Sequence, residues 1–188
     1  MKKYIKYINF LYVIEFLLFS RCSKQKYHLT IDRLYNSTYL SSCGDENSRE
    51  YITLKSGHFE STKVDSTDGG PYIDRYSMDI YSHNIAFGDL CGDGREYAAL
   101  CLAEWTGGSG VFISLNVIVN SNGSPIHIAG FQLGDRIKAD SVFIQDKVIR
   151  VKAVIQRDNQ GACCPDSQTT WKFKIEGDNL KKITEAQF

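Results

Sequence analysis

The segment 88–96 carries the side chains with the clearest potential for metal chemistry. Its sequence, Gly-Asp-Leu-Cys-Gly-Asp-Gly-Arg-Glu, places the carboxylates of Asp89 and Asp93 around glycines that favour a tight turn. Calcium takes about six to eight oxygen ligands, which such a loop supplies from alternating carboxylates and a backbone carbonyl. We therefore take Asp89, Asp93, Arg95 (through its carbonyl) and Glu96 as candidate metal ligands.

This segment also departs from a complete metal site. It resembles the calcium loops of FG-GAP-like integrin repeats and EF-hand-like proteins, but Cys91 stands at the third position and Tyr97 at the ninth. Glu96 is one residue out of place, and a site with two well-placed carboxylates binds calcium weakly. The alternative is a structural turn, in which Asp89 and Asp93 accept hydrogen bonds from loop N–H groups. We expect no cofactor, with weakly bound calcium as the alternative.

Six cysteines offer a second kind of chemistry. In an exported chain they indicate disulfide bonds more strongly than a metal site. Cys163 and Cys164 are adjacent, and neighbouring side chains of an extended segment point to opposite sides, so each is expected to form its own bridge. A redox site has no support, because the sequence lacks a CxxC spacing. The disulfide candidates are Cys43, Cys91, Cys101, Cys163 and Cys164.

The N-terminus has the layout of a signal peptide. Three lysines among the first six residues precede the segment 10–19, which is apolar at every position except Glu15. This run is too short to span a membrane, which takes about twenty apolar residues. We therefore predict a signal peptide over residues 1–20, with a buried N-terminal helix as the alternative.

Cys22 lies where a bacterial lipoprotein carries its lipid. The match is partial, because Arg21 occupies a position where a small residue normally precedes the cysteine. Cleavage after Ser20 without lipidation is the alternative. Lipidation of Cys22 would give a membrane attachment and leave five cysteines, of which at least one would stay unpaired or pair between molecules. The predicted location is extracytoplasmic: periplasmic, secreted or anchored as a lipoprotein.

The remaining chain fits one domain. The full sequence balances 22 basic against 22 acidic residues, and loss of three lysines and one glutamate with the signal peptide leaves a net charge of −2. A nucleic-acid partner is not expected, because its binder would carry a basic excess on one face. We assign residues 21–29 to a linker and residues 30–188 to a single β domain.

The hydrophobic pattern after the linker has a period of two, which indicates β-strands. In the segment 111–120, the odd positions are apolar, while Ser114, Asn116 and Asn120 are expected to face water. A tight turn is expected at Asn122-Gly123. The other predicted strands are 51–54, 58–61, 95–103, 126–131, 141–144, 148–155 and 169–176.

Several connections can also be predicted. Thr30 is expected to cap a single helical turn. Residues 55–57 are expected to join two short strands as a hairpin, and the tyrosine-rich segments 72–76 and 81–83 are expected to form exposed loops. The predicted fold is mainly β: a single antiparallel β-sandwich or open barrel, with a short helical turn after the signal helix.

The order of several motifs resembles a family of uncharacterised bacterial exported proteins, many of them lipoproteins. Cys91, Tyr97 and Arg21 depart from the family pattern. The resemblance implies an extracytoplasmic location and a β fold, and it brings no activity with it. The matching features are the segments 34–39, 88–96, 107–110 and 133–136, the Cys-Cys-Pro motif at 163–165, and an aromatic strand at Trp171.

No group of residues has the spacing of an established catalytic site. The four histidines lack metal-ligand spacing, and the glycine-rich segment 107–110 lacks the strand-to-helix context of a hydrolase nucleophile. We expect a non-catalytic envelope protein that binds a protein or glycan ligand, a role that exposed tyrosines suit. The alternative is a metal-dependent or carboxylate-based hydrolase built from Asp89, Asp93 and Asp135. Otherwise Asp135 is expected to form a local ion pair with Arg136.

Overall fold

The computed structural model describes residues 27–44, 49–67, 70–81, 84–156 and 166–183. The predicted signal peptide, Cys22, Cys163 and Cys164 lie outside these residues. No helix in the described part is long and apolar enough to cross a membrane. The described elements are α2 (Ile31–Tyr35), β1 (Thr38–Leu40), β2 (Tyr51–Thr53), β3 (His58–Thr67), β4 (Gly70–Ile80), β5 (Ala86–Gly88), β6 (Tyr97–Trp105), β7 (Phe112–Ser121), β8 (Ser124–Asp135), β9 (Lys138–Gln145), β10 (Val148–Ile155), β11 (Ser167–Glu176) and β12 (Asn179–Ile183).

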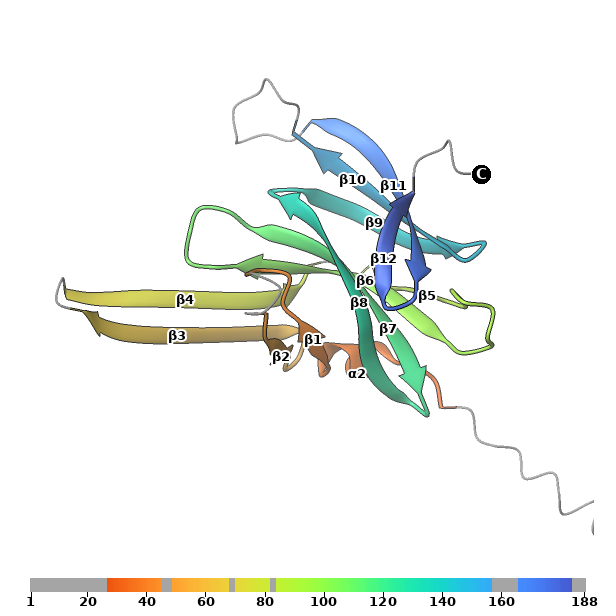
Figure 1. Ribbon diagram of the computed structural model, residues 1–188, viewed down its shortest axis with the longest axis horizontal. Helices are drawn as coiled ribbons and strands as arrows, with labels where there is room; N and C mark the ends of the chain where they lie inside the picture. Colours follow the sequence, from red (N-terminus) through yellow and green to blue (C-terminus); the bar gives the residue numbers. More distant parts are fainter. Residues whose placement is uncertain (1–26, 45–48, 68–69, 82–83, 157–165, 184–188) are drawn as a thin grey trace, which may run out of the picture.

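The strands form an antiparallel β-sandwich, as the period of two predicts (Figure 1). The large sheet has the order β3-β4-β6-β7-β8, with β5 paired to one end of β6. The small sheet has the order β12-β11-β10-β9, and β1 and β2 form a separate two-stranded sheet. The described strands close no barrel, so the sandwich alternative of the predicted fold is the one observed.

The main core lies between the large and small sheets. Odd-numbered residues of the central strands, such as Cys101 and Leu115, face Ile149 and Val151 of the small sheet. Phe173 completes this core and is fully buried. Burial of side chains of this size contributes about 1.5–3 kcal/mol each, which holds the two sheets together. The apolar face predicted for the strand around residues 111–120 is thus confirmed for the positions within β7.

A second core lies on the opposite face of the large sheet. Leu34 of α2 and Tyr39 of β1 pack there with Leu100 and Ile118 of the central strands. Thr30 caps α2 as predicted, because its hydroxyl accepts a hydrogen bond from the N–H of Arg33 at 3.3 Å. The N-terminal segment therefore forms a third layer over the large sheet.

This layer overturns one sequence prediction. Ser114 and Asn116 were expected to face water, but each is only 1% exposed. Their side chains hydrogen-bond to each other at 2.9 Å, and Asn116 Oδ1 lies 2.9 Å from Nε2 of His127. Burial lowers the pKa of His127 to about 4, so its ring is neutral at physiological pH. The prediction was wrong because the strand pattern cannot reveal which distant segment covers a polar face.

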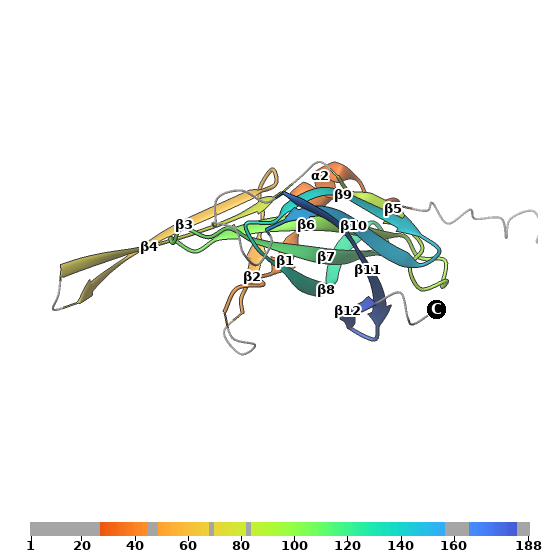
Figure 2. The same ribbon diagram turned by 90° about the horizontal axis from the view of Figure 1, so that it is seen from above.

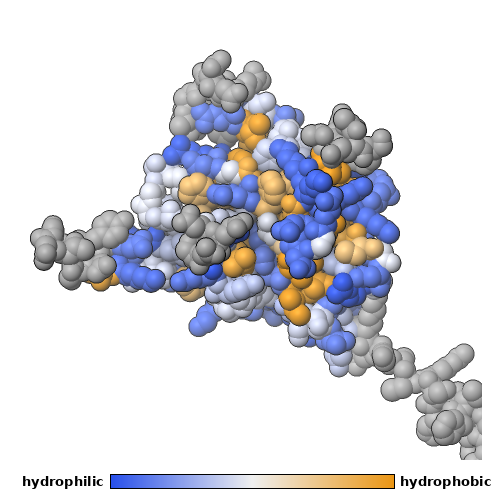
Figure 3. Space-filling model, viewed as in Figure 1, coloured by the Kyte–Doolittle hydropathy of each residue, from blue (hydrophilic) through white to orange (hydrophobic). Residues whose placement is uncertain are grey.

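The β3–β4 hairpin projects from the body of the sandwich (Figure 2). The two strands pair along their whole length, but β4 pairs with β6 only from Ser77 to Ile80. The outer half of the hairpin is therefore a two-stranded ribbon among the described residues. The coloured part of the hairpin in Figure 3, which lies next to the sandwich, is largely hydrophilic.

Here two sequence predictions were wrong. The segment 51–54 was expected to pair with 58–61, but β2 pairs with β1 and β3 pairs with β4. The turn at 55–57 does form, closed by a bridge between Lys55 and His58. The segment 72–76 lies within strand β4 rather than in an exposed loop. The second error has a physical cause: residues 62–64, 74 and 75 of the hairpin are exposed, so no apolar alternation marks these strands.

Candidate functional site

The segment 88–96 begins at the end of β5, leads into β6, and folds its first carboxylate onto its own backbone. Asp89 Oδ1 accepts hydrogen bonds from the N–H groups of Cys91 and Gly92 at 3.1 and 2.6 Å. Its Oδ2 accepts one from the N–H of Gly94 at 3.3 Å. The structural role considered from the sequence is therefore confirmed for Asp89.

Asp93 is also held within this segment. Its Oδ1 accepts the N–H of Arg95 at 3.0 Å, and its Oδ2 accepts the hydroxyl of Tyr97 at 2.8 Å. The Arg95 guanidinium lies 2.7 Å from the same oxygen. The backbone hydrogen bond from Arg95, with support from Tyr97, lowers the pKa of Asp93 to about 2. Asp93 is thus ionised at physiological pH and fully engaged by its neighbours.

Glu96 is directed away from these two aspartates and holds the N-terminal segment. It accepts hydrogen bonds from the N–H of Leu29 at 2.7 Å and from Asn120 Nδ2 at 3.1 Å, and His28 lies at 3.3 Å. Burial opposes ionisation, but these hydrogen bonds outweigh it and lower the pKa of Glu96. Leu29 itself is buried, although the sequence placed it at the end of a linker.

The predicted metal ligands are therefore not brought together as a set. Asp89 and Asp93 accept hydrogen bonds from groups of the loop and the start of β6, while Glu96 accepts one from the N-terminal segment. Within the described residues, no three His, Cys, Asp or Glu side chains form a group that could hold a metal ion. Calcium binding by Asp89, Asp93, Arg95 and Glu96 stays a prediction that the observed hydrogen bonds do not favour.

The three aspartates of the alternative hydrolase site are separated as well. Asp135 ends β8, where its Oδ1 accepts the N–H of Val111 at 2.9 Å and its Oδ2 lies 3.6 Å from Arg136. The local ion pair expected from the sequence is confirmed. Asp135 pairs with Phe112, which in turn pairs with Glu104 at the far end of β6 from the calcium-like loop. The structure therefore does not assemble a site from Asp89, Asp93 and Asp135.

Three of the cysteines proposed for disulfide bonds are described, and no bridge joins any two of them. Cys101 faces the main core and is fully buried, whereas Cys43 lies by Glu104 on the opposite side of the large sheet. Cys91 is exposed in the loop. The sheet separates Cys43 from Cys101, so these two thiols cannot pair. Bridges to Cys163 and Cys164 stay a prediction.

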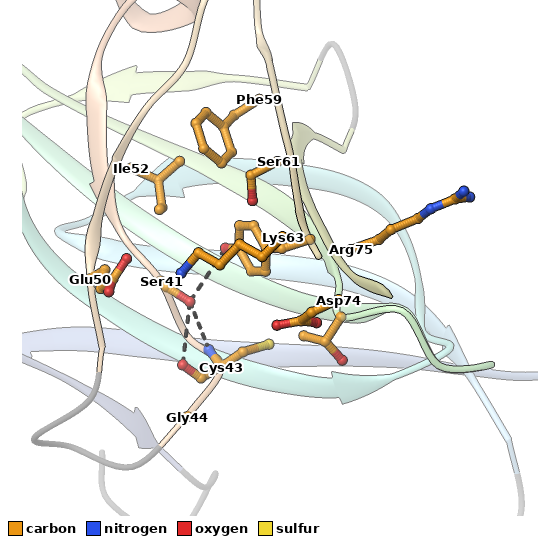
Figure 4. Close-up of a pocket in the computed structure, with 12 residues that line it drawn as sticks. Ser41, Cys43, Gly44, Glu50, Ile52, Phe59, Ser61, Lys63, Asp74 and Arg75 are labelled. Atoms are coloured by element: carbon orange, nitrogen blue, oxygen red, sulfur yellow. Dashed lines mark hydrogen bonds between the residues drawn. The ribbon is translucent and has the colours of Figure 1, made fainter. Parts of the chain in front are cut away.

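A pocket of about 380 Å³ opens at the base of the β3–β4 hairpin (Figure 4). One wall comes from the paired strands of the hairpin, and the other from β2 and the segment that follows β1. We call this cavity the hairpin pocket. The described residues that line it are Ser41, Cys43, Gly44, Glu50, Ile52, Phe59, Ser61, Lys63, Asp74, Arg75, Tyr76 and Thr106.

A buried carboxylate lies beside the hairpin pocket. Glu104, near the end of β6, is 0% exposed. It accepts hydrogen bonds from the hydroxyls of Ser41, Ser42 and Tyr76 at 2.6, 2.5 and 2.7 Å, and from the N–H of Ser42 at 2.8 Å. A carboxylate can be buried only if such donors replace water. Glu104 thus joins the segment after β1 to strand β4 and fixes the shape of the pocket.

This carboxylate influences two groups that line the pocket. Burial, reinforced by the nearby Glu104 charge, raises the pKa of Cys43 to about 12. Burial and the same charge raise the pKa of Tyr76. Both groups are therefore protonated at physiological pH. Neither is an activated nucleophile, because the thiolate or phenolate form is the reactive one.

The hairpin wall changes in character from base to tip. The register pairs Phe59 with Met78, Ser61 with Tyr76, and Lys63 with Asp74, and directly paired residues share one face. The base of the pocket is therefore apolar, the middle carries hydroxyls, and the rim is charged. Figure 4 shows the Lys63 amine and the Asp74 carboxylate turned into the pocket.

Sequence reasoning missed this pocket. Glu104 carried a usable signal, because it is the only charged residue in the apolar strand 97–105. Tyr76 was considered for recognition, but within a loop. Ser41 and Ser42 gave no signal, since their role depends on contacts with residues more than sixty positions away.

Comparisons of the chain with family models, with curated proteins and with solved structures find no match. The resemblance to exported bacterial proteins therefore stays a prediction from the motifs.

Proposed function

We propose that this protein is a non-catalytic binding module and that its ligand occupies the hairpin pocket. One observation carries the proposal: the pocket combines aromatic, hydroxyl and charged side chains, and the buried carboxylate of Glu104 beside it holds the lining residues Ser41 and Tyr76 by hydrogen bonds. Concave sites with an apolar base and a few polar groups are the usual form of a ligand site.

The chemistry of the pocket supports binding over catalysis. A nucleophile needs an adjacent base that can accept its proton. The Ser41 hydroxyl does donate a hydrogen bond to Glu104. However, the same carboxylate also accepts hydrogen bonds from the hydroxyls of Ser42 and Tyr76, and it is buried away from solvent. Cys43 stays a thiol because its pKa is raised to about 12. The hydrogen bonds of Ser41, Ser42 and Tyr76 to Glu104 instead fix the position of the pocket wall that a ligand would contact.

We also propose that the module works outside the cytoplasm. The sequence supports this through the predicted signal peptide, and an anchor at Cys22 would leave the pocket accessible. Tyr27, the first described residue, lies by the β7–β8 turn, where its carbonyl accepts a hydrogen bond from Asn120 at 2.6 Å. The β3–β4 hairpin projects at the other end of the body (Figure 1). Fractionation of cells that express the wild type or Cys22→Ser tests the anchor: only the wild type is expected in the membrane fraction.

A matched pair of substitutions tests the binding role. Ser61 lines the pocket, whereas Thr62 is the next residue of β3 and points to the opposite face. Ser61→Trp would fill the cavity, and Thr62→Trp adds the same side chain outside it. We expect retention of ligand from envelope protein or glycan fractions by the wild type and T62W, and loss of retention by S61W.

Circular dichroism and thermal unfolding of both variants show whether each is folded. If S61W unfolds, Glu50→Trp on the opposite wall replaces it as the blocking variant. Equal retention by a folded blocking variant and by T62W would contradict the proposal, as would the absence of any retained ligand on the wild type.

A further inference from the structure

The charges that face the hairpin pocket are unequal in number. Glu50 and Asp74 contribute two carboxylates at the rim, and Glu104 contributes a third beside it. Among the described residues, Lys63 contributes the one ammonium group that turns inward. The other cation of the lining, Arg75, pairs with Thr62 and shares its face, and its guanidinium is turned away from the pocket (Figure 4).

The carboxylates at the rim are open to a ligand. In the described part of the chain, neither Glu50 nor Asp74 forms a hydrogen bond or an ion pair through its side chain. Even Lys63, the direct neighbour of Asp74 across the hairpin, makes no ion pair with it. Both carboxylate residues are exposed at the rim and free to bind a group from outside.

Below the rim, the pocket offers apolar and aromatic surface. Phe59 and Tyr76 contact each other with ring centroids 6.2 Å apart, and Ile52 faces them from the opposite wall. Long basic side chains bury their aliphatic stems on such surface while the charged end meets carboxylates. Aromatic faces also attract cations.

We infer that the hairpin pocket binds a cationic group on an aliphatic chain, an ammonium or guanidinium, supplied by a basic side chain of a partner protein. This inference rests on the proposed binding role of the same pocket. A volume of about 380 Å³ is at the small end of ligand sites and suits one basic side chain with its adjacent backbone. The hairpin beyond the pocket provides the extended surface along which the partner's backbone lies.

Lys63 has a specific role in this arrangement. Its ammonium group occupies the space in which a ligand cation would meet Glu50 and Asp74 (Figure 4). It therefore competes with the ligand and lowers its affinity. Removal of this charge is expected to strengthen binding, an effect that damage to the fold would not produce.

Titrations of the full mature chain, followed by amide NMR shifts, test the inference. The probes are N-acetyl-lysinamide, N-acetyl-argininamide, the free diamine cadaverine, the neutral N-acetyl-norleucinamide and the acidic N-acetyl-glutamamide. We expect the basic probes to bind about tenfold more tightly than the neutral one, with shifts at residues 59–63 and 74–76. Tighter binding of the amino-acid probes assigns the cation to a polypeptide. Tighter binding of cadaverine assigns it to a small amine and overturns the protein source.

Three variants refine the test. Glu50→Gln combined with Asp74→Asn is expected to weaken the basic probes about tenfold, and Lys63→Gln to strengthen them about threefold. Glu60 lies on the outer face of β3, so Glu60→Gln is the matched control. Its affinity for the basic probes is expected within about twofold of that of the wild type. On the wild type alone, an increase in salt from about 50 to 500 mM should weaken the basic probes.

The outcomes separate this inference from the proposed function. Neutral or acidic probes that bind at the pocket as well as basic ones would overturn the cation preference while the binding role stands. Unchanged affinity for the basic probes in both the Lys63→Gln variant and the Glu50→Gln/Asp74→Asn variant would also overturn the cation preference. If no probe binds but S61W still abolishes retention of an envelope ligand, the cation inference again fails alone. If both experiments are negative, the binding role fails too.

Discussion

The calcium-like loop and the hairpin pocket both use carboxylates, but they use them in opposite ways. In the segment 88–96, Asp89 and Asp93 are bonded to groups within five residues of themselves, at the surface. At the hairpin pocket, Glu104 is buried and bonded to Ser41 and Ser42, more than sixty residues away in the chain. The first region has a recognisable sequence motif and a local role. The second has no motif and organises the tertiary structure.

This difference shows what a motif can and cannot reveal. Local hydrogen bonds follow from residue order, so the structural role of Asp89 was foreseeable. A buried carboxylate depends on donors that folding brings to it, and a missing donor leaves a charge without compensation. The functional candidate of this protein therefore lies where the sequence is least informative.

Removal of the buried carboxylate should give the largest effect. Glu104→Ala leaves the hydroxyls of Ser41, Ser42 and Tyr76 and one N–H without their acceptor. We expect the free energy of unfolding to fall by about 3 kcal/mol, and by about 1–2 kcal/mol in the better-matched Glu104→Gln. Urea denaturation measures both. A loss below about 0.5 kcal/mol in the alanine variant would show that Glu104 does not organise this region.

Acid should destabilise the second core at a higher pH than the calcium-like loop. His127 has a pKa of about 4 in the folded protein against 6.5 when unperturbed, so the unfolded chain binds a proton first as the pH falls. Its contribution to stability is complete above pH 6.5 and is lost as the pH approaches 4. For Asp93 the corresponding window is lower, from 3.8 to about 2. Between pH 7 and 5, destabilisation should therefore come from the second core and leave the loop intact.

His127→Gln checks this interpretation. Glutamine has an amide that can donate to Asn116 and does not titrate. Thermal midpoints of the variant should change less than those of the wild type between pH 7 and 5. An identical slope in the two proteins would assign the acid sensitivity to another group.

The loop should respond more weakly than the pocket. Asp89→Ala removes hydrogen bonds to three backbone N–H groups, but water can replace them at an exposed site. We expect a loss of about 1 kcal/mol in the free energy of unfolding, below that of Glu104→Ala. Added calcium should not change the melting temperature of the wild type, because its candidate ligands are already engaged. A rise of several degrees that Asp89→Ala abolishes would restore the metal site.

The last prediction compares single thiols in the two regions through their rates of labelling. At neutral pH, the exposed Cys91 should react first, Cys43 far more slowly because its pKa is raised to about 12, and the buried Cys101 only on unfolding. Mass spectrometry of timed samples identifies the labelled sites. If Cys43 reacts as fast as Cys91, the environment assigned to the pocket is wrong. Labelling before and after reduction also tests the predicted bridges to Cys163 and Cys164.

The strands of the two-sheet sandwich could be predicted from the sequence, whereas the third layer and the projecting hairpin could not. Alternation in β7 and β10 and the turn at Asn122 and Gly123 follow from residues that contact the main core or need positive backbone angles. The third layer could not be predicted, because Ser114 and Asn116 are polar and still buried. The projecting hairpin was missed for the converse reason: its described residues 62–64, 74 and 75 are exposed and leave no periodic apolar signal. The pocket arises where these two unpredicted parts meet.

Hydrogen–deuterium exchange with the retained envelope ligand tests the central claim most directly, since it reports on both regions in one experiment. Ligand binding at the hairpin pocket should slow exchange of the amides at residues 41–44, 59–63 and 74–76. The segment 88–96 should exchange at the same rate with and without ligand. Protection confined to the segment 88–96, or none at the hairpin pocket, would contradict the account.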